Sequence, residues 1–299
     1  MQAAVKELGA NDPAIASLLD RQATLLRVIA RYEDAELINR RALAIDEASH
    51  GNVHPDVARD LNNLAILLKH TNRLAEAEPL YRRALAIDEA SFGNDHPNVA
   101  RDLNNLAQLL QATNRLAEAE PLMRRALAID EASYGNDHPE VAIDLNNLAV
   151  LLKVTNRMAE AEPLYRRALA IDEASFGNDH PNVAVNLNNL AALLKATNRL
   201  AEAEPLMRRA LAIDEASYGP DHPLVANRLN NLALLLQATN RLAEAEPLSG
   251  RAVQILLASL GSDHPHTQMG NDNYLKILQA QSLSKIEIEA KLGALEHPG

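Results

Sequence analysis

A single 42-residue unit recurs along the chain, and this period constrains the fold more than any other feature of the sequence. Each copy begins with a His-Pro dipeptide, and Asp12-Pro13 stands on the same phase. The dipeptides are His54-Pro55, His96-Pro97, His138-Pro139, His180-Pro181, His222-Pro223 and His264-Pro265. A fixed period of about 20 to 50 residues is typical of a solenoid, in which each unit packs against its neighbours.

Within one copy the pattern predicts two helices. Pro97 follows the polar pair Asp95-His96 and suits the first position of a helix. Apolar residues then recur at helical spacing, at Leu103, Leu106, Ala107 and Leu110. Thr113-Asn114-Arg115 breaks this pattern, a second helix is expected from about Leu116, and Gly135 is expected to end it in a left-handed conformation. Each copy is therefore predicted to be a helix hairpin, and the fold class to be all-α.

We expect one continuous array over residues 1–299, because a repeat array has no single core to outgrow. The copies start near residues 13, 55, 97, 139, 181 and 223, and a degenerate capping copy covers residues 265–299. Residues 1–8 resemble the end of a helix whose beginning is missing, which suggests a fragment of a longer multidomain protein. In the last copy, Ile286, Ile288 and Leu292 are expected in a shortened second helix that caps the array.

Composition and motifs narrow the function classes. The chain has no cysteine, so disulfides and thiolate metal sites are excluded, and it has neither a signal peptide nor an apolar run long enough to span a bilayer. We therefore expect a cytoplasmic protein. The formal net charge of -11 argues against binding to nucleic acid or to anionic membranes. No phosphate-binding loop or nucleophile elbow is present, so we expect no cofactor and no enzymatic activity.

The segments NNLAQLL and NRLAEAEPLMRRAL resemble the tetratricopeptide repeat, in the 42-residue form found in kinesin light chains and in many bacterial repeat proteins. The resemblance covers essentially the whole chain. It implies a right-handed superhelical solenoid of helix-turn-helix repeats that serves as a scaffold for protein partners. It also implies that the first helix of each hairpin lines a concave groove for peptides. In kinesin light chains these peptides are extended and carry an aromatic residue among acidic ones.

Helical geometry places the groove independently of the family. The apolar stripe through Leu103 and Leu106 faces the second helix, so the opposite side carries Arg101, Asn105, Gln108 and Ala112, with Asn104 and Gln111 on one flank. The copies over residues 97–138 and 181–222 differ at five positions, and three of these lie on that face or its flank. Such variation suits graded recognition of an extended partner. The alternative is neutral drift at exposed sites.

Asparagine pairs recur in the first helices although asparagine is a mediocre helix former. Their amides offer donors and acceptors to a peptide backbone, whereas the structural alternative is hydrogen bonding between adjacent repeats. Basic residues on the same face would attract carboxylates, so the partner can carry acidic residues. The candidate peptide-binding residues are Arg59, Asn62, Asn63, Lys69, Arg101, Asn104, Asn105, Gln108, Gln111, Asn146, Asn147, Lys153, Asn188, Asn189, Lys195, Asn230 and Asn231.

Other repeated residues are assigned structural roles. The histidines of the His-Pro pairs stand one repeat apart and are not expected to converge on a metal. The run Ile87-Asp88-Glu89 is expected on a solvated helix face, and Tyr81 and Met123 at equivalent positions are expected in the core. Two functions remain open. One is a scaffold that binds an extended segment of a partner protein, and the other is a structural spacer that self-associates through its terminal repeats.

Overall fold

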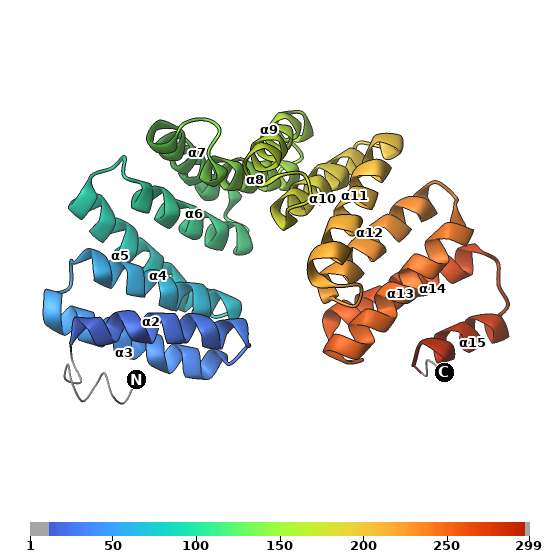
Figure 1. Cartoon of the computed structure of the whole chain (residues 1–299), viewed down its shortest axis with the longest axis horizontal. Coiled ribbons are helices and arrows are strands. Elements are labelled where there is room, and N and C mark those ends of the chain that lie inside the picture. Colours follow the sequence, from blue (N-terminus) through green and yellow to red (C-terminus); the bar gives the residue numbers. More distant parts are fainter. Residues whose placement is uncertain (1–11, 297–299) are drawn as a thin grey trace. The chain divides into compact units, whose positions relative to one another are not determined.

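The computed structural model describes residues 12–296, and this part of the chain contains fourteen α-helices and no strand. First helices have 16 residues, second helices have 19, and the last helix has 12. Figure 1 follows the helices in chain order. Their bounds are α2 Pro13–Val28, α3 Tyr32–His50, α4 Pro55–His70, α5 Leu74–Phe92, α6 Pro97–Ala112, α7 Leu116–Tyr134, α8 Pro139–Val154, α9 Met158–Phe176, α10 Pro181–Ala196, α11 Leu200–Tyr218, α12 Pro223–Ala238, α13 Leu242–Leu260, α14 Pro265–Ala280 and α15 Lys285–Glu296.

The His-Pro dipeptides begin first helices, as predicted. At the start of α6 the Nδ1 atom of His96 accepts the backbone N–H of Asn98 at 3.1 Å, and Pro97 occupies the first helical position. The imidazole also stacks on Phe92 at the end of α5, with ring centroids 4.4 Å apart. Five of the six histidines, all but His264, stack in this way on a ring at the end of the preceding second helix, a packing role that the sequence did not reveal.

The turns depend on residues that tolerate positive φ. Asn114 lies between α6 and α7 with φ of 59°, in the left-handed region that asparagine visits more readily than most residues. Gly135 ends α7 with φ of 87° and ψ of 163°. The positive φ was predicted, but the ψ value places Gly135 in the extended region that essentially only glycine adopts.

The predicted apolar stripe forms the core. Leu103, Leu106, Ala107 and Leu110 of α6 are all buried. Leu103 packs with Ala126 and Ile129 of α7, while Val99 and Ala100 extend the same cluster. Within each unit, a first helix thus packs against the second helix of its hairpin, and a second helix also contacts the next first helix, as α7 contacts α8. Tyr81 and Met123 are buried, which confirms their packing role.

The chain divides into two compact units, one ending at Thr155 and one beginning at Asn156. The first unit contains α2 to α8 and the second α9 to α15. In the first unit α2, α4, α6 and α8 contact one another in turn, whereas α3, α5 and α7 approach one another less closely. The first helices therefore form the inner layer of this unit. A single continuous array over residues 1–299 stays a prediction.

The terminal copies are degenerate, as expected. Residues 1–8, predicted to be the end of a helix, lie outside the described part of the chain. At the other end the shortened helix α15 packs Leu295 against Val253, Tyr274 and Leu278, with Ile288 and Leu292 partly buried beside them. Ile286 lies in this helix as predicted, but its side chain is 79 % exposed. Among the described helices, none is both long and apolar enough to cross a membrane.

Candidate functional site

A cavity lies on the inner layer where the sequence placed the groove. It has a volume of about 290 Å³ between α6 and α8 and includes the end of α7. Predicted groove residues among its lining are Arg101, Asn104, Asn105, Gln108 and Asn147, and Ile143 stands at the position of Arg101 one repeat later. The remaining lining residues are Pro97, Asn98, Asp130, Tyr134 and Glu140. The structure thus brings groove positions of two consecutive repeats into one hollow.

At Asn62 and Asn104, the first asparagine of the pair connects its first helix to the next one. The Nδ2 atom of Asn62 donates to Oδ1 of Asp102 at 2.5 Å, across one repeat boundary. Asn104 donates in the same way to Asp144. Both amides are buried, as is Asn230. The structural alternative therefore describes the Nδ2 donors of Asn62 and Asn104, which are committed to aspartates of the neighbouring repeat.

The second asparagines lie nearer the surface and extend the same network. Asn105 donates to Oδ1 of Asn62 at 3.3 Å, and Asn231 donates to Oδ1 of Asn188 at 3.0 Å. All five second asparagines are half-buried, and so are Asn146 and Asn188. The Nδ2 atom of Asn147 has no hydrogen-bond partner among the described residues, and its side chain lines the cavity. Asn147 is therefore the member of the ladder best placed to donate to a ligand.

A ladder of buried carboxyl groups, which the sequence reasoning missed, runs beneath this face. In the first unit, an aspartate near the end of each second helix lies close to an aspartate of the next first helix. The three pairs in the first unit are Asp46 with Asp60, Asp88 with Asp102, and Asp130 with Asp144. Asp88 is only 1 % exposed, so its assignment to a solvated helix face is wrong. Burial raises the pKa of every member of these pairs.

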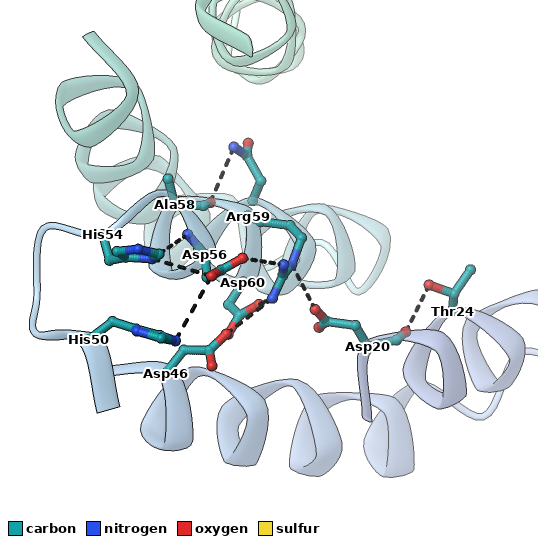
Figure 2. Close-up of polar contacts among 10 residues, drawn as sticks. Asp20, Thr24, Asp46, His50, His54, Asp56, Ala58, Arg59 and Asp60 are labelled. Carbon is teal, nitrogen blue, oxygen red and sulfur yellow. Dashed lines mark hydrogen bonds and ion pairs between the residues drawn. The ribbon is translucent and has the colours of Figure 1, made fainter. Parts of the chain in front are cut away.

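Arginine neutralises two of these pairs. Figure 2 shows the Arg59 guanidinium between carboxylates of three helices, with contacts of 2.9 Å to Asp20, 3.0 Å to Asp46, 2.5 Å to Asp56 and 3.1 Å to Asp60.

Arg101 occupies the equivalent place one repeat later, at 3.1 Å from Asp88 and 2.9 Å from Asp102. Both guanidinium groups are engaged inside the array. The expectation that Arg59 and Arg101 attract the carboxylates of a partner is therefore not supported by their surroundings.

The lysines of the groove are placed differently. Lys69 donates from Nζ to Oε1 of Gln108 at 2.9 Å, which links two consecutive first helices. Lys69, Lys153 and Lys195 are half-buried, and burial lowers the pKa of each ammonium group. Gln111 is also half-buried on the same row. Among the described residues, Lys69, Lys153 and Lys195 form no ion pair with a carboxylate. The positive charge of the predicted groove that stays unpaired therefore lies on this row.

Two histidines and an aspartate converge at the start of α4. Candidate ligand atoms of His50, His54 and Asp56 lie within 4.8 Å of one another. However, Nδ1 of His54 already accepts the backbone N–H of Asp56, and the Asp56 carboxylate pairs with Arg59. The His50 and His54 rings stack with centroids 4.3 Å apart (Figure 2). This arrangement matches the His-aromatic stack of the later repeats, with His50 in the aromatic position, and we assign no metal to it.

The second helices α5, α7, α9 and α11 are almost identical in sequence, and their contacts give a structural cause. Arg125 of α7 contacts Glu89 of α5 at 2.6 Å, and Arg115 contacts Glu78 of α5 at 2.7 Å while also pairing with Glu118. Equivalent ion pairs recur in the second unit, for example between Arg241 and Glu204. Constancy at these positions therefore follows from contacts between repeats. The constancy of the second helices therefore does not show how fast unconstrained exposed positions change, and it does not decide between recognition and neutral drift on the inner face.

Consecutive antiparallel hairpins, packed in two layers with a varied inner face, define the chain as a helical repeat protein. The chain belongs to the tetratricopeptide repeat family, whose sequence pattern matches residues 14–90, 56–132, 104–173, 142–216 and 187–258. A comparison with curated protein sequences gives no match.

Solved structures show the same fold. The nearly identical TPR-like repeats of a Podosopora anserina protein described as a kinesin light chain are 24% identical, with a TM-score of 0.59, covering 69% of this chain and 98% of that one. BtubC from P. vanneervenii is 26% identical, with a TM-score of 0.63, covering 83% and 94%. The tetratricopeptide repeat sensor protein PH0952 from Pyrococcus horikoshii is 13% identical, with a TM-score of 0.68, covering 93% and 41%. Kinesin light chain-like repeat proteins are thus among its structural neighbours.

Proposed function

We propose that this tetratricopeptide repeat protein is a scaffold that binds an extended segment of a partner protein along the inner face of its first helices. The observation that carries the proposal is the cavity of about 290 Å³ lined by Arg101, Asn105, Gln108, Ile143 and Asn147. These residues belong to the face that varies between otherwise almost identical copies. The tetratricopeptide family is typically built for protein partners, which agrees with binding rather than catalysis. A cytoplasmic location accompanies the proposal.

The chemistry of the face supports contacts to a peptide backbone. Side-chain amides donate and accept, so Asn105, Gln108 and Asn147 suit the polar groups of an extended strand whatever its sequence. Lys69, Lys153 and Lys195 provide a row that suits acceptor groups, including carboxylates. Asn62 and Asn104 support this face from beneath by joining neighbouring helices. The binding contribution therefore falls on the second asparagine of each pair and on the lysine row.

A random peptide library screened against the intact chain tests the proposal. The groove variant carries Asn105→Ala and Asn147→Ala, and the matched control carries Arg82→Ala and Arg124→Ala on the outer layer. Arg82 pairs with Glu78 and Arg124 with Glu120, both within one helix, so the control also removes two polar side chains. Circular dichroism checks that all three proteins fold.

Peptides enriched on the intact chain and on the control, but lost on the groove variant, are the expected result. Enrichment that survives in the groove variant would move binding to another surface. A folded chain that enriches no peptide at all would reject the scaffold proposal.

Self-association through the terminal repeats is the second candidate function. Leu25 and Val28 on α2 and Leu37 on α3 are large apolar side chains that are 67%, 75% and 72% exposed. Apolar surface of this kind at the end of a repeat array favours stacking onto another copy. Light scattering over a concentration series, with Leu25→Glu and Leu37→Glu as the disrupting variant, separates the two functions. Mass that grows with concentration and falls in this variant supports assembly, and a constant monomer mass opposes it.

A further inference from the structure

Each aspartate near the end of a second helix has a nitrogen donor in four of the copies. Asp46 pairs with Arg59 at 3.0 Å, Asp88 with Arg101 at 3.1 Å, and Asp214 with Arg228 at 2.7 Å. Asp172 accepts a hydrogen bond from Asn186 at 2.7 Å, where an amide replaces the second carboxyl group. Each of these solutions gives one oxygen of the aspartate a donor, which offsets part of the penalty of burying the carboxylate.

The copy that joins α7 to α8 lacks such a donor. Ile143 stands at the position of Arg59 and Arg101, yet both acidic residues, Asp130 and Asp144, are retained. Asp144 accepts a hydrogen bond from Asn104, whereas Asp130 receives none from an N–H group among the described residues. Asp130 is only 5 % exposed.

No arginine contacts the pair among the described residues, and the group whose charge opposes the pKa shift of Asp130 is His138 at the start of α8. Arg101, the nearest guanidinium of the cavity lining, contacts Asp88 and Asp102. Glu140 adds a third acidic group at the start of α8 and raises the pKa of both aspartates. This hollow is therefore acidic, whereas Arg59 and Arg101 occupy the equivalent places in the two preceding repeats.

The uncompensated carboxylate faces open space. Asp130, Glu140 and Ile143 all line the cavity of about 290 Å³ between α6 and α8. Oδ1 of the buried Asn104, another lining residue, also lacks a hydrogen-bond donor. The hollow therefore presents acceptors that need donors, together with negative charge that needs a cation.

We propose that this hollow receives the guanidinium group of an arginine side chain from the bound partner segment, an inference that rests on the scaffold function proposed above. The guanidinium takes the place that Arg59 and Arg101 fill from within the chain. It carries five N–H donors and no acceptor, so it can bind Asp130 and Glu140 and also reach Asn104. A lysine ammonium has three donors on one atom and spans such a set less well.

A pair of peptides that differ in one side chain tests this assignment. The first is a capped alanine pentapeptide with a central arginine, and the second has citrulline, which keeps the shape and loses the charge. Binding is followed by two-dimensional NMR of the Asn147 and Gln108 side-chain amides. We expect the arginine peptide to bind the intact chain at least about tenfold more tightly than the citrulline peptide, equivalent to about 1.4 kcal/mol.

Two variants copy solutions that the chain already uses. Ile143→Arg fills the hollow as Arg101 does, and Asp144→Asn reproduces the Asp172–Asn186 pair, with an amide that can donate to Asp130. Both variants should fold and lose the preference for arginine over citrulline. Equal binding of the two peptides to the intact chain overturns the assignment, and so does a preference that persists in Ile143→Arg.

The library screen separates this inference from the scaffold proposal. Groove-dependent peptides without a preferred basic residue would leave the scaffold proposal standing and reject the arginine site. Arginine preference in the pentapeptides that depends on Ile143 and Asp144, without any peptide enriched from the library, would support the cation site and reject the extended groove.

Discussion

Replacing Ile143 with arginine should stabilise the chain, although it removes a large apolar side chain. Ile143 is 47 % exposed, so the loss of its contacts changes stability by no more than about 0.5 kcal/mol, as is usual for surface substitutions. The new guanidinium would lie beside Asp130 and Asp144, as Arg101 lies beside Asp88 and Asp102. The buried pair would then gain the charge-assisted hydrogen bonds that it lacks.

The size of the effect is that of hydrogen bonds to a charged group, about 1.5–3 kcal/mol. Burial raises the pKa of both Asp130 and Asp144. A carboxyl group whose pKa is raised by folding keeps its proton in the folded state, so the stability of the fold decreases as the pH rises toward that value. Ile143→Arg should offset this loss by giving the ionised pair a hydrogen-bonded cation.

The stabilisation should therefore depend on pH. Near pH 5 the Asp130–Asp144 pair keeps its protons, because burial raises the pKa of Asp130 to about 6, and the new arginine meets little charge. Near pH 9 both groups are ionised and the full gain should appear. The other titratable groups around the pair are His138 and Glu140 at the start of α8. Tyr134 at the end of α7 and Arg101 on α6 also line the cavity.

Urea unfolding followed by circular dichroism at pH 5 and pH 9 measures the effect. The matched control is Ile143→Arg in an Asp144→Asn background, where one carboxyl group is already replaced and the gain at pH 9 should shrink. A gain of the same size at both pH values would show that the arginine acts through packing or general charge. An equal gain in the Asp144→Asn background would also refute the reasoning.

Three further substitutions test the fold itself, with Gly293→Ala as the matched control for one of them. Leu106→Ala should cost about 2–5 kcal/mol of unfolding free energy, because Leu106 is almost fully buried between two helices. Gly135→Ala should cost about 1–3 kcal/mol from backbone strain alone, since an added Cβ meets no neighbour, whereas Gly293→Ala on α15, at ordinary φ, should be neutral or stabilising. Tyr81→Phe should leave stability unchanged or raise it by about 1 kcal/mol, because the buried hydroxyl has no hydrogen-bond partner among the described residues. Urea titrations measure all three, and a loss above about 2 kcal/mol in Tyr81→Phe would mean that its hydroxyl is bound.

The helices and the core follow from the sequence because local signals repeat without conflict. The apolar spacing through Leu103 and Leu110, the proline at Pro97 and the glycine at Gly135 each mark one feature of the hairpin. Repetition turns these weak local signals into a strong one, since every copy has to satisfy the same packing. The inner face could be placed in the same way, because it is the side of the first helix opposite the buried stripe.

The buried polar network could not be derived from helical spacing. Asp88 is predicted on a solvated helix face, and only the packing of α5 against α6 brings its carboxyl group beside that of Asp102. Likewise, helical spacing places Arg59 on the face that is free to bind a ligand. In the structure its guanidinium contacts four carboxylates from three helices. Hydrogen bonds between repeats depend on the rise and rotation from one hairpin to the next, which no single copy encodes. The signal was present in the neighbouring residues, since Arg101-Asp102 changes to Val185-Asn186 as a unit.

Because these two positions change together there, the copy with Ile143 and Asp144, in which only the first position has changed, is informative. Where the arginine is lost at Val185, the carboxyl group beside it is lost as well, and Asn186 satisfies the remaining Asp172. At Ile143 the arginine is lost while Asp144 stays, which leaves two buried carboxyl groups without a cation and at a cost in stability. Drift at an exposed position accounts for the isoleucine but not for the retained pair beneath it. An arginine supplied by a partner accounts for both, because binding then recovers the free energy that the two carboxyl groups cost the unbound chain.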